Sequence, residues 1–260
     1  MKKTLTVSLI TLVLLSLSGC NKPQSVDKAA SSSLEPVLNP SDFYPNDDVL
    51  KRSDDHFESN EFKPLANHCW EYTTARKCIA LYSKEGDGTH VSSAEIGGFF
   101  AEYSYAGKKW EVKAENLAFS QNGGWGVAPQ PFFVQLGPDR YGFVMTTAST
   151  QGGYLEERLS LYGVNGKGFV EMLQLPSRYN NGMTGNEDSM LYDVLVTLSQ
   201  VLDPAKEFYD LKATLAVDGK YDLEGDQELT KLFGKGTEVK FAFNNGQYIP
   251  EGQAGGKPAN

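Results

Sequence analysis

The regular alternation of apolar and polar residues is the sequence feature that most constrains the fold of this chain. Residues 208–217 show it most clearly: one face carries Tyr209, Leu211, Ala213, Leu215 and Val217, and the other carries Asp210, Lys212 and Thr214. The same period of two recurs in residues 110–113 and 238–243. Because successive side chains of a strand point to opposite faces, this pattern predicts half-buried antiparallel strands.

Turn dipeptides separate the expected strands. Asn165-Gly166, Asp218-Gly219 and Asn245-Gly246 all accept the positive backbone angles of tight hairpins. Residues 161–167 and 214–220 match in kind, which indicates a weak internal repeat. Residues 132–175 fit four consecutive strands, the size of one propeller blade. We therefore predict a mainly β domain over residues 61–252, in which antiparallel hairpin repeats form a partial propeller-like or barrel-like structure. A plain meander of hairpins gives a similar pattern.

Two segments depart from the all-strand pattern. Residues 227–233 predict a short helix, with Asp226 as its N-cap and Gly234 as its stop. Residues 190–202 fit both the period of a strand and the period of a helix, because their apolar residues also form a helical stripe. The repeat and the β-branched residues favour a strand there.

The first residues have the layout of a signal peptide. Lys2 and Lys3 precede an apolar run over residues 5–17, which is too short for a stable membrane span of about 20 residues. The run ends in Leu17-Ser18-Gly19-Cys20, which resembles the lipobox of bacterial lipoproteins. This resemblance covers only the first twenty residues. It implies that residues 1–19 are removed and that Cys20 carries the lipid anchor; an ordinary secretory signal with an unrelated cysteine is the alternative.

The lipoprotein resemblance also implies a location in the bacterial cell envelope. In enteric-type sorting, an aspartate after the lipidated cysteine retains the protein in the inner membrane, whereas this chain has Asn21. The outer membrane is therefore favoured over the inner membrane. Lys22 leaves this sorting open, because the rules at nearby positions differ among bacteria.

Residues 20–60 are interpreted as a flexible tether, and residues 253–260 as a disordered tail. The tether has a run of small residues over 29–33 and then three prolines, Pro36, Pro40 and Pro45. Cutting before Cys20 removes two lysines and no acidic residue, so the formal net charge falls from −9 to −11. Such a charge argues against nucleic acid and anionic lipid head groups as partners. It suits a cationic partner, although many soluble proteins are acidic without one.

Cys69 and Cys78 are the two cysteines that remain when Cys20 is lipidated. Because they lie close in sequence and in an oxidising compartment, we expect a disulfide between them. A zinc site formed by both cysteines with His68 and His90 is the alternative. It lacks the closely spaced cysteine pairs of structural zinc sites.

The sequence contains no glycine-flanked serine elbow, paired-histidine metal motif or phosphate loop. We therefore predict no catalytic residue, metal or cofactor. The alternative is a loose calcium site in the acidic stretch that includes Asp218, Asp222, Glu224, Asp226 and Glu228. An EF-hand loop that starts at Asp222 needs glycine at its sixth position, where Gln227 stands.

Two aromatic residues are candidate contact residues. Trp125 lies among glycines in residues 122–129, and an aromatic side chain on a flexible loop is a plausible recognition element. Tyr179 stands at the start of the longest expected polar loop and is the second candidate. In the alternative interpretation, Trp125 packs over the core.

These observations lead to three functional hypotheses. The first is a membrane-anchored, non-enzymatic lipoprotein that binds another envelope protein or an imported one, for example an immunity protein whose negative charge speeds the capture of a basic toxin. The second is a carrier of lipid or another small apolar ligand, and the third is a cell-wall hydrolase. An exposed aromatic loop favours the first, a continuous apolar cavity the second, and a cleft with converging carboxylates the third.

Overall fold

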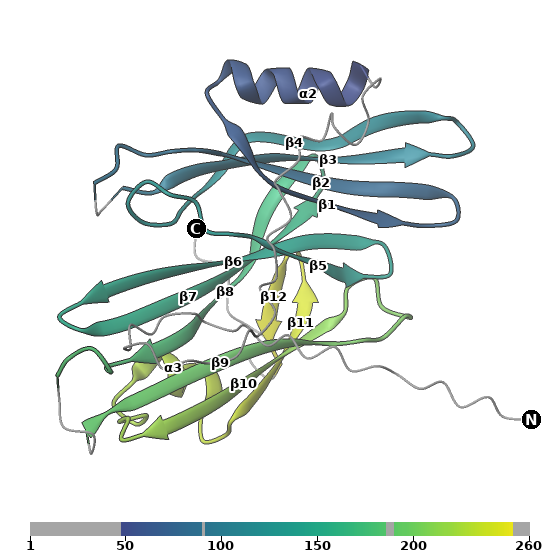
Figure 1. Ribbon diagram of the computed structural model, residues 1–260. Helices are drawn as coiled ribbons and strands as arrows, with labels where there is room; N and C mark the ends of the chain where they lie inside the picture. The colour runs from purple at the N-terminus through teal and green to yellow at the C-terminus, as the bar shows by residue number, and fades with distance from the viewer. Residues whose placement is uncertain (1–47, 90–91, 186–189, 252–260) are drawn as a thin grey trace, which may run out of the picture.

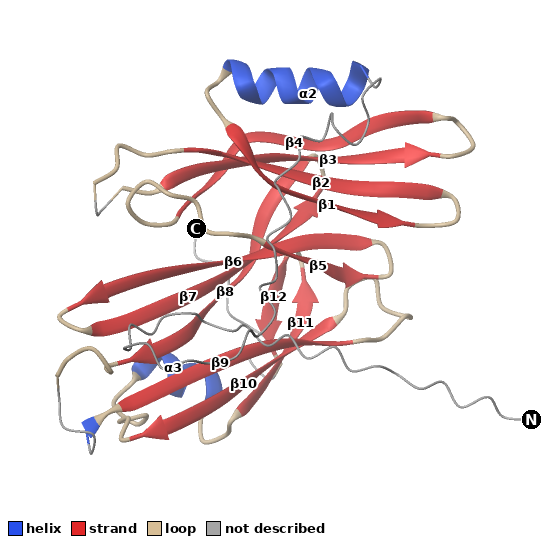
Figure 2. Cartoon of the chain, viewed as in Figure 1, coloured by secondary structure: helices blue, strands red, loops and turns tan. Residues whose placement is uncertain are grey.

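A computed structural model describes residues 48–89, 92–185 and 190–251 and shows a mainly β chain (Figures 1 and 2). Twelve strands form two antiparallel sheets in the described residues. The first sheet has the order β1-β2-β3-β4, and the second has the order β12-β11-β10-β9-β8-β7-β6-β5. The four-stranded sheet comprises β1 (Lys63–Glu71), β2 (Ala75–Lys84), β3 (Ala94–Ser104) and β4 (Lys109–Asn122). The eight-stranded sheet comprises β5 (Phe132–Gly137), β6 (Arg140–Gln151), β7 (Tyr154–Asn165), β8 (Gly168–Asn180), β9 (Tyr192–Val201), β10 (Asp210–Gly219), β11 (Glu238–Asn244) and β12 (Gln247–Pro250).

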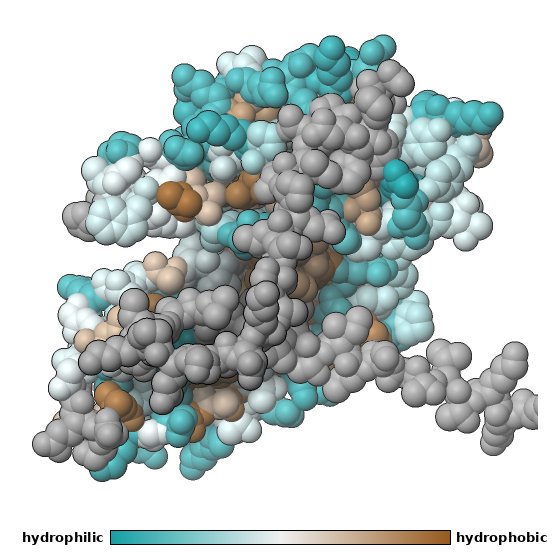
Figure 3. Space-filling model, viewed as in Figure 1, coloured by the Kyte–Doolittle hydropathy of each residue, from teal (hydrophilic) through white to brown (hydrophobic). Residues whose placement is uncertain are grey.

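Helix α2 (Asp48–Ser59) covers the outer face of the four-stranded sheet (Figure 1). Its apolar residues Leu50 and Phe57 are fully buried, and Phe57 stacks on Tyr82 of β2 with 4.3 Å between the ring centroids. The solvent-facing surface of the helix is hydrophilic (Figure 3). The expectation of a flexible tether over residues 20–60 is therefore wrong for residues 48–59, because the sheet buries one side of this helix. Residues 1–47, with Cys20 and the rest of the expected tether, lie outside the described residues, as does the tail 253–260.

The two sheets pack face to face through aromatic side chains. Tyr141 and Phe143 of β6 and Tyr162 of β7 are buried together with Ile79 and Phe100 of the four-stranded sheet. The opposite face of β6 and β7 packs on a second core, shared with β9–β12. All five residues from Tyr141 to Met145 are buried, because β6 has a core on both faces. This is why the central strands lack the alternation that marks the outer ones.

The eight-stranded sheet folds back on itself without closing into a barrel within the described residues. Its strands β5–β8 are the four consecutive strands expected over residues 132–175, but they continue into β9 and do not form a separate blade. The strands β8 and β9 pair through only three register positions, Arg178↔Leu195 to Asn180↔Asp193. Beyond these positions the two halves diverge and enclose a core between them.

The other local predictions can be checked element by element. Helix α3 (Gln227–Phe233) is confirmed, with Asp226 accepting from the backbone N–H of Leu229 at 2.9 Å and Gly234 at its C-cap. Residues 192–201 form a strand, as favoured above. Asn245 and Gly246 form the turn of the β11–β12 hairpin, both with positive φ. Asp218-Gly219 ends β10 and leads toward α3, so the expectation of a tight hairpin there is wrong. No helix in the described residues has the length and apolar character to cross a membrane.

Candidate functional site

Trp125 lies in the connection between β4 and β5, residues 123–131, here called the Trp125 loop. Its tip is a tight turn in which the N–H of Val127 donates to the carbonyl of Gly124 at 3.1 Å. The N–H of Gly126 donates to the carbonyl of Ser92, and the N–H of Gly86 donates to the carbonyl of Gly126. These bonds tie the turn to the β2–β3 connection, so that a loop rich in glycine is held in one conformation.

The Trp125 side chain is 67% exposed, and Val127 is exposed beside it. The alternative in which Trp125 packs over the core is therefore not what the structure shows. The base of the loop is anchored instead by Ala128 and by Phe133, which pack on the core between the sheets. The arrangement presents a large aromatic side chain to solvent on a fixed support.

The backbone of Trp125 is in the left-handed region, with φ of 58°. Gly123, two residues before it, and Gly126, directly after it, also have positive φ, and glycine adopts this conformation without steric cost. A bulky residue there is strained by about 1–2 kcal/mol, because its Cβ approaches the following carbonyl. Strained residues of this kind concentrate at ligand-contacting sites. Tryptophan therefore occupies a position at which glycine would avoid this backbone strain.

Negative charge lies next to the Trp125 loop. Asp87 follows Gly86, whose N–H bonds to the loop, and its carboxylate accepts hydrogen bonds from the backbone and the hydroxyl of Thr89 at 3.0 and 2.8 Å. These bonds hold the pKa of Asp87 below its usual range. An ionised carboxylate thus lies on the segment that is bonded to the Trp125 loop.

A polar cleft of about 320 Å³ opens between the ends of the two sheets, beside the start of the Trp125 loop. It is lined by Asn122 and Gly123 on one side and by Ser149, Glu156 and Arg158 on the other, among others. The Glu156 carboxylate accepts from Arg158 at 3.3 Å, and Arg158 also donates twice to Glu228 of α3, at 2.6 and 3.0 Å. The Glu156 carboxylate in this cleft is therefore engaged in an ion pair with Arg158.

Tyr179 is the last but one residue of β8, and its placement on a polar loop is therefore wrong. Its ring stacks on Tyr221 with 6.1 Å between centroids, and its hydroxyl donates to Glu228 at 3.4 Å. Burial raises the pKa of the Tyr179 hydroxyl. Tyr179 thus packs the β8 end against the segment that precedes α3, and we do not retain it as a contact residue. Part of the following loop, residues 186–189, lies outside the described residues.

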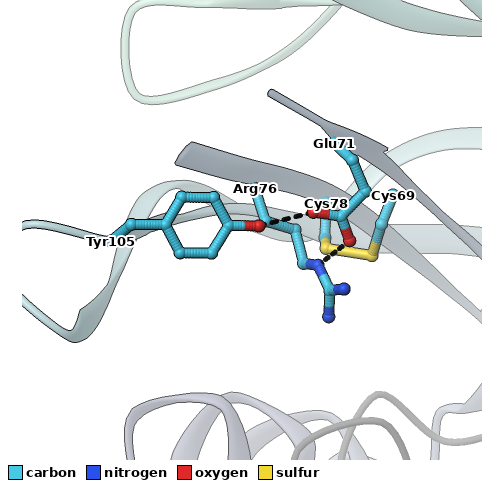
Figure 4. Close-up of a disulfide and its surroundings, with 5 residues drawn as sticks. All are labelled: Cys69, Glu71, Arg76, Cys78 and Tyr105. Carbon is cyan, nitrogen blue, oxygen red and sulfur yellow. Dashed lines mark hydrogen bonds and ion pairs between the residues drawn. A yellow bond between two sulfur atoms is a disulfide. The ribbon is translucent and has the colours of Figure 1, made fainter. Parts of the chain in front are cut away.

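Cys69 and Cys78 lie opposite each other on β1 and β2 at disulfide distance, as expected (Figure 4). Near them, Arg76 forms an ion pair with Glu71, which also accepts a hydrogen bond from the hydroxyl of Tyr105 at 2.5 Å. The described residues contain no group of ligands that could hold a metal. The alternative zinc ligand His68 stacks instead on Phe133, and burial lowers its pKa. His90 lies outside the described residues.

The acidic stretch near α3 is used for local structure. Asp222 accepts from the N–H of Gly225 at 3.0 Å, and Asp226 accepts from the hydroxyl of Tyr221 at 2.5 Å in addition to capping α3. These bonds explain the carboxylates as turn and cap residues.

Comparison of the chain with protein-family models, with curated proteins and with solved structures found no match.

Proposed function

We propose that this protein is a non-enzymatic envelope lipoprotein that binds another envelope protein, or an imported one, through the Trp125 loop. The observation that carries the proposal is the exposed tryptophan in a strained, left-handed conformation on an anchored turn. Exposed aromatic residues of this kind often dominate the affinity of an interface. A side chain that stabilised only the fold would be expected inside the core, without backbone strain.

The charge of the chain supports a basic partner. The net charge after cleavage is −11, and the ionised Asp87 lies beside the loop. Opposite charge across an interface accelerates association and excludes partners of the same sign. An immunity protein that captures a basic toxin is one specific form of this function.

The anchor belongs to the same proposal. Lipid on Cys20 would hold the domain at the membrane surface, with residues 21–47 between the anchor and α2. We place the protein at the outer membrane, because Asn21 is not the aspartate that retains enteric lipoproteins in the inner membrane.

Trp125→Ala is expected to weaken partner capture by about thirtyfold or more, because hot-spot aromatic residues contribute about 2 kcal/mol or more. The test is affinity capture from envelope extract, with the bound proteins identified by mass spectrometry. Tyr105→Ala is the matched control, since Tyr105 is an exposed aromatic residue in the β3–β4 turn, at the other end of β3 from the connection that holds the Trp125 loop. A specific partner retained equally by both variants would show that the loop is not the contact surface.

A further inference from the structure

An apolar pocket of about 380 Å³ lies between β5 and β9, apart from the Trp125 loop. Its floor includes Val144, Leu161 and Leu211 from β6, β7 and β10. Phe132 and Leu202 also line the pocket, and they are 46% and 52% exposed. Apolar side chains thus continue from the core to the solvent at this place.

The pocket arises from the way the eight-stranded sheet folds back. β9 leaves β8 after Leu195, and β5 ends the order of the sheet, so that two strand edges face each other. The edges meet at one end, where the N–H of Tyr209 donates to the carbonyl of Leu136 at 2.7 Å. At the same end the Gln200 amide donates to the carbonyl of Gln135 at 2.5 Å. These bonds therefore join the two strand edges at the end of the pocket where Leu202 lies, and Phe132 lies at the other end of the lining.

The lining defines the chemistry of a ligand. Nine of the thirteen lining residues are apolar and none is charged. Among the polar ones, Gln200 is bonded to Gln135, and the hydroxyl of Ser199 donates to the carbonyl of Lys212 at 3.2 Å. These groups are already engaged within the protein, so the surface left for a ligand is the apolar one.

The length and volume of the pocket limit which apolar ligands fit it. The lining takes five consecutive residues of β5, 132–136, which span about 13 Å at the rise of a strand. A volume of about 380 Å³ drawn out along this length is at the small end of ligand pockets and has room for one extended chain.

We propose that this pocket binds the acyl chain of a single-chain lipid. The hydrocarbon tail lies along the apolar lining toward the end joined by Gln135 and Gln200, and the polar head group remains in solvent beside Phe132. Phe133 both lines the pocket and anchors the base of the Trp125 loop, but no residue of the loop itself, 123–131, lines the pocket, so the proposal does not rest on the proposed protein-binding function.

The test uses the chain from residue 20 with Cys20→Ser, which keeps every described residue and carries no lipid of its own. The probe is the fluorescent fatty acid cis-parinaric acid, followed by fluorescence titration. We expect saturable binding with one site per chain, displaced by dodecanoic acid and not by butyric acid. Absence of saturable binding, or equal displacement by the two acids, would overturn the proposal.

Leu202→Glu places a charge in the apolar lining and is expected to weaken probe binding tenfold or more. Leu195→Glu is the matched control, because Leu195 is the same residue type, lies on β9 just before Leu202 in the chain, is 38% exposed and does not line the pocket. Phe132→Glu at the other end of the lining should repeat the loss if Leu202→Glu fails to fold. Equal affinities of these two variants and the control would contradict the site, whereas Trp125→Ala should leave the affinity unchanged.

Discussion

Phe143→Ala should lower the free energy of unfolding by about 3–5 kcal/mol, the usual cost of removing a buried phenylalanine ring. Phe143 is fully buried between the two sheets. Its ring stacks on Tyr162 at 5.3 Å and contacts Phe169 and Phe119 at 5.7 and 5.8 Å between centroids. Because these residues come from both sheets, the loss should appear in a single unfolding transition of the whole domain.

Guanidinium chloride unfolding of the wild type and the variant measures this difference. Phe132→Ala is the matched control, since Phe132 is the same residue type in a half-exposed position at the start of β5. It should cost about 1 kcal/mol or less, in the range of substitutions outside the core. A loss below about 1 kcal/mol for Phe143→Ala, or two separate transitions, would show that the sheets do not share a core.

Cys20→Ala is expected to move the protein from the membrane fraction to the soluble fraction almost completely. Attached acyl chains contribute about 0.8 kcal/mol for each buried methylene group, so that several chains make anchoring effectively permanent. Without the thiol, no lipid can be attached at this position. The measurement is the distribution of the protein between membrane and soluble fractions of the envelope.

Asn21→Asp provides a matched control for lipid anchoring. It keeps the thiol and should remain in the membrane fraction, and enteric-type sorting predicts a shift from the outer to the inner membrane. If Cys20→Ala stays with the membranes, either the cysteine is not the lipid site or a second attachment exists.

Helix α2 shows where local sequence is insufficient to predict the fold. Its buried positions Leu50, Ser53, Asp54 and Phe57 have helical spacing, but half of them are polar. The buried Asp54 accepts a hydrogen bond from Tyr82 of β2, which compensates for the burial of its carboxylate. This partner lies 28 residues away in the sequence. The segment alone therefore gives no sign that Asp54 is buried, and its composition is that of a solvated tether. Outer strands, α3 and the Asn245-Gly246 turn were predictable because their signals are local, whereas Asp218-Gly219 leads to α3 and forms no tight hairpin.

Some features of the candidate site were likewise predictable from local sequence, and others were not. Cys69 and Cys78 lie on adjacent strands of one hairpin, so sequence spacing was enough to pair them. The exposure of Trp125 depends on bonds from its loop to Gly86 and Ser92, which are far from it in sequence. Tyr179 was misplaced because Tyr221, which covers it, is brought near by the fold. The pocket between β5 and β9 was not predictable, since it depends on the divergence of β9 from β8.

Trp125→Gly is the variant that tests the central claim most directly, namely that this position keeps a strained tryptophan for contact with a partner. Glycine adopts φ of 58° without strain, while the more flexible unfolded chain offsets part of that gain. We therefore predict a free energy of unfolding within about 1 kcal/mol of the wild type, together with the loss of partner capture by the same purified sample. A loss of about 3–5 kcal/mol in stability, as for a core tryptophan, or full capture by the glycine variant, would contradict the account.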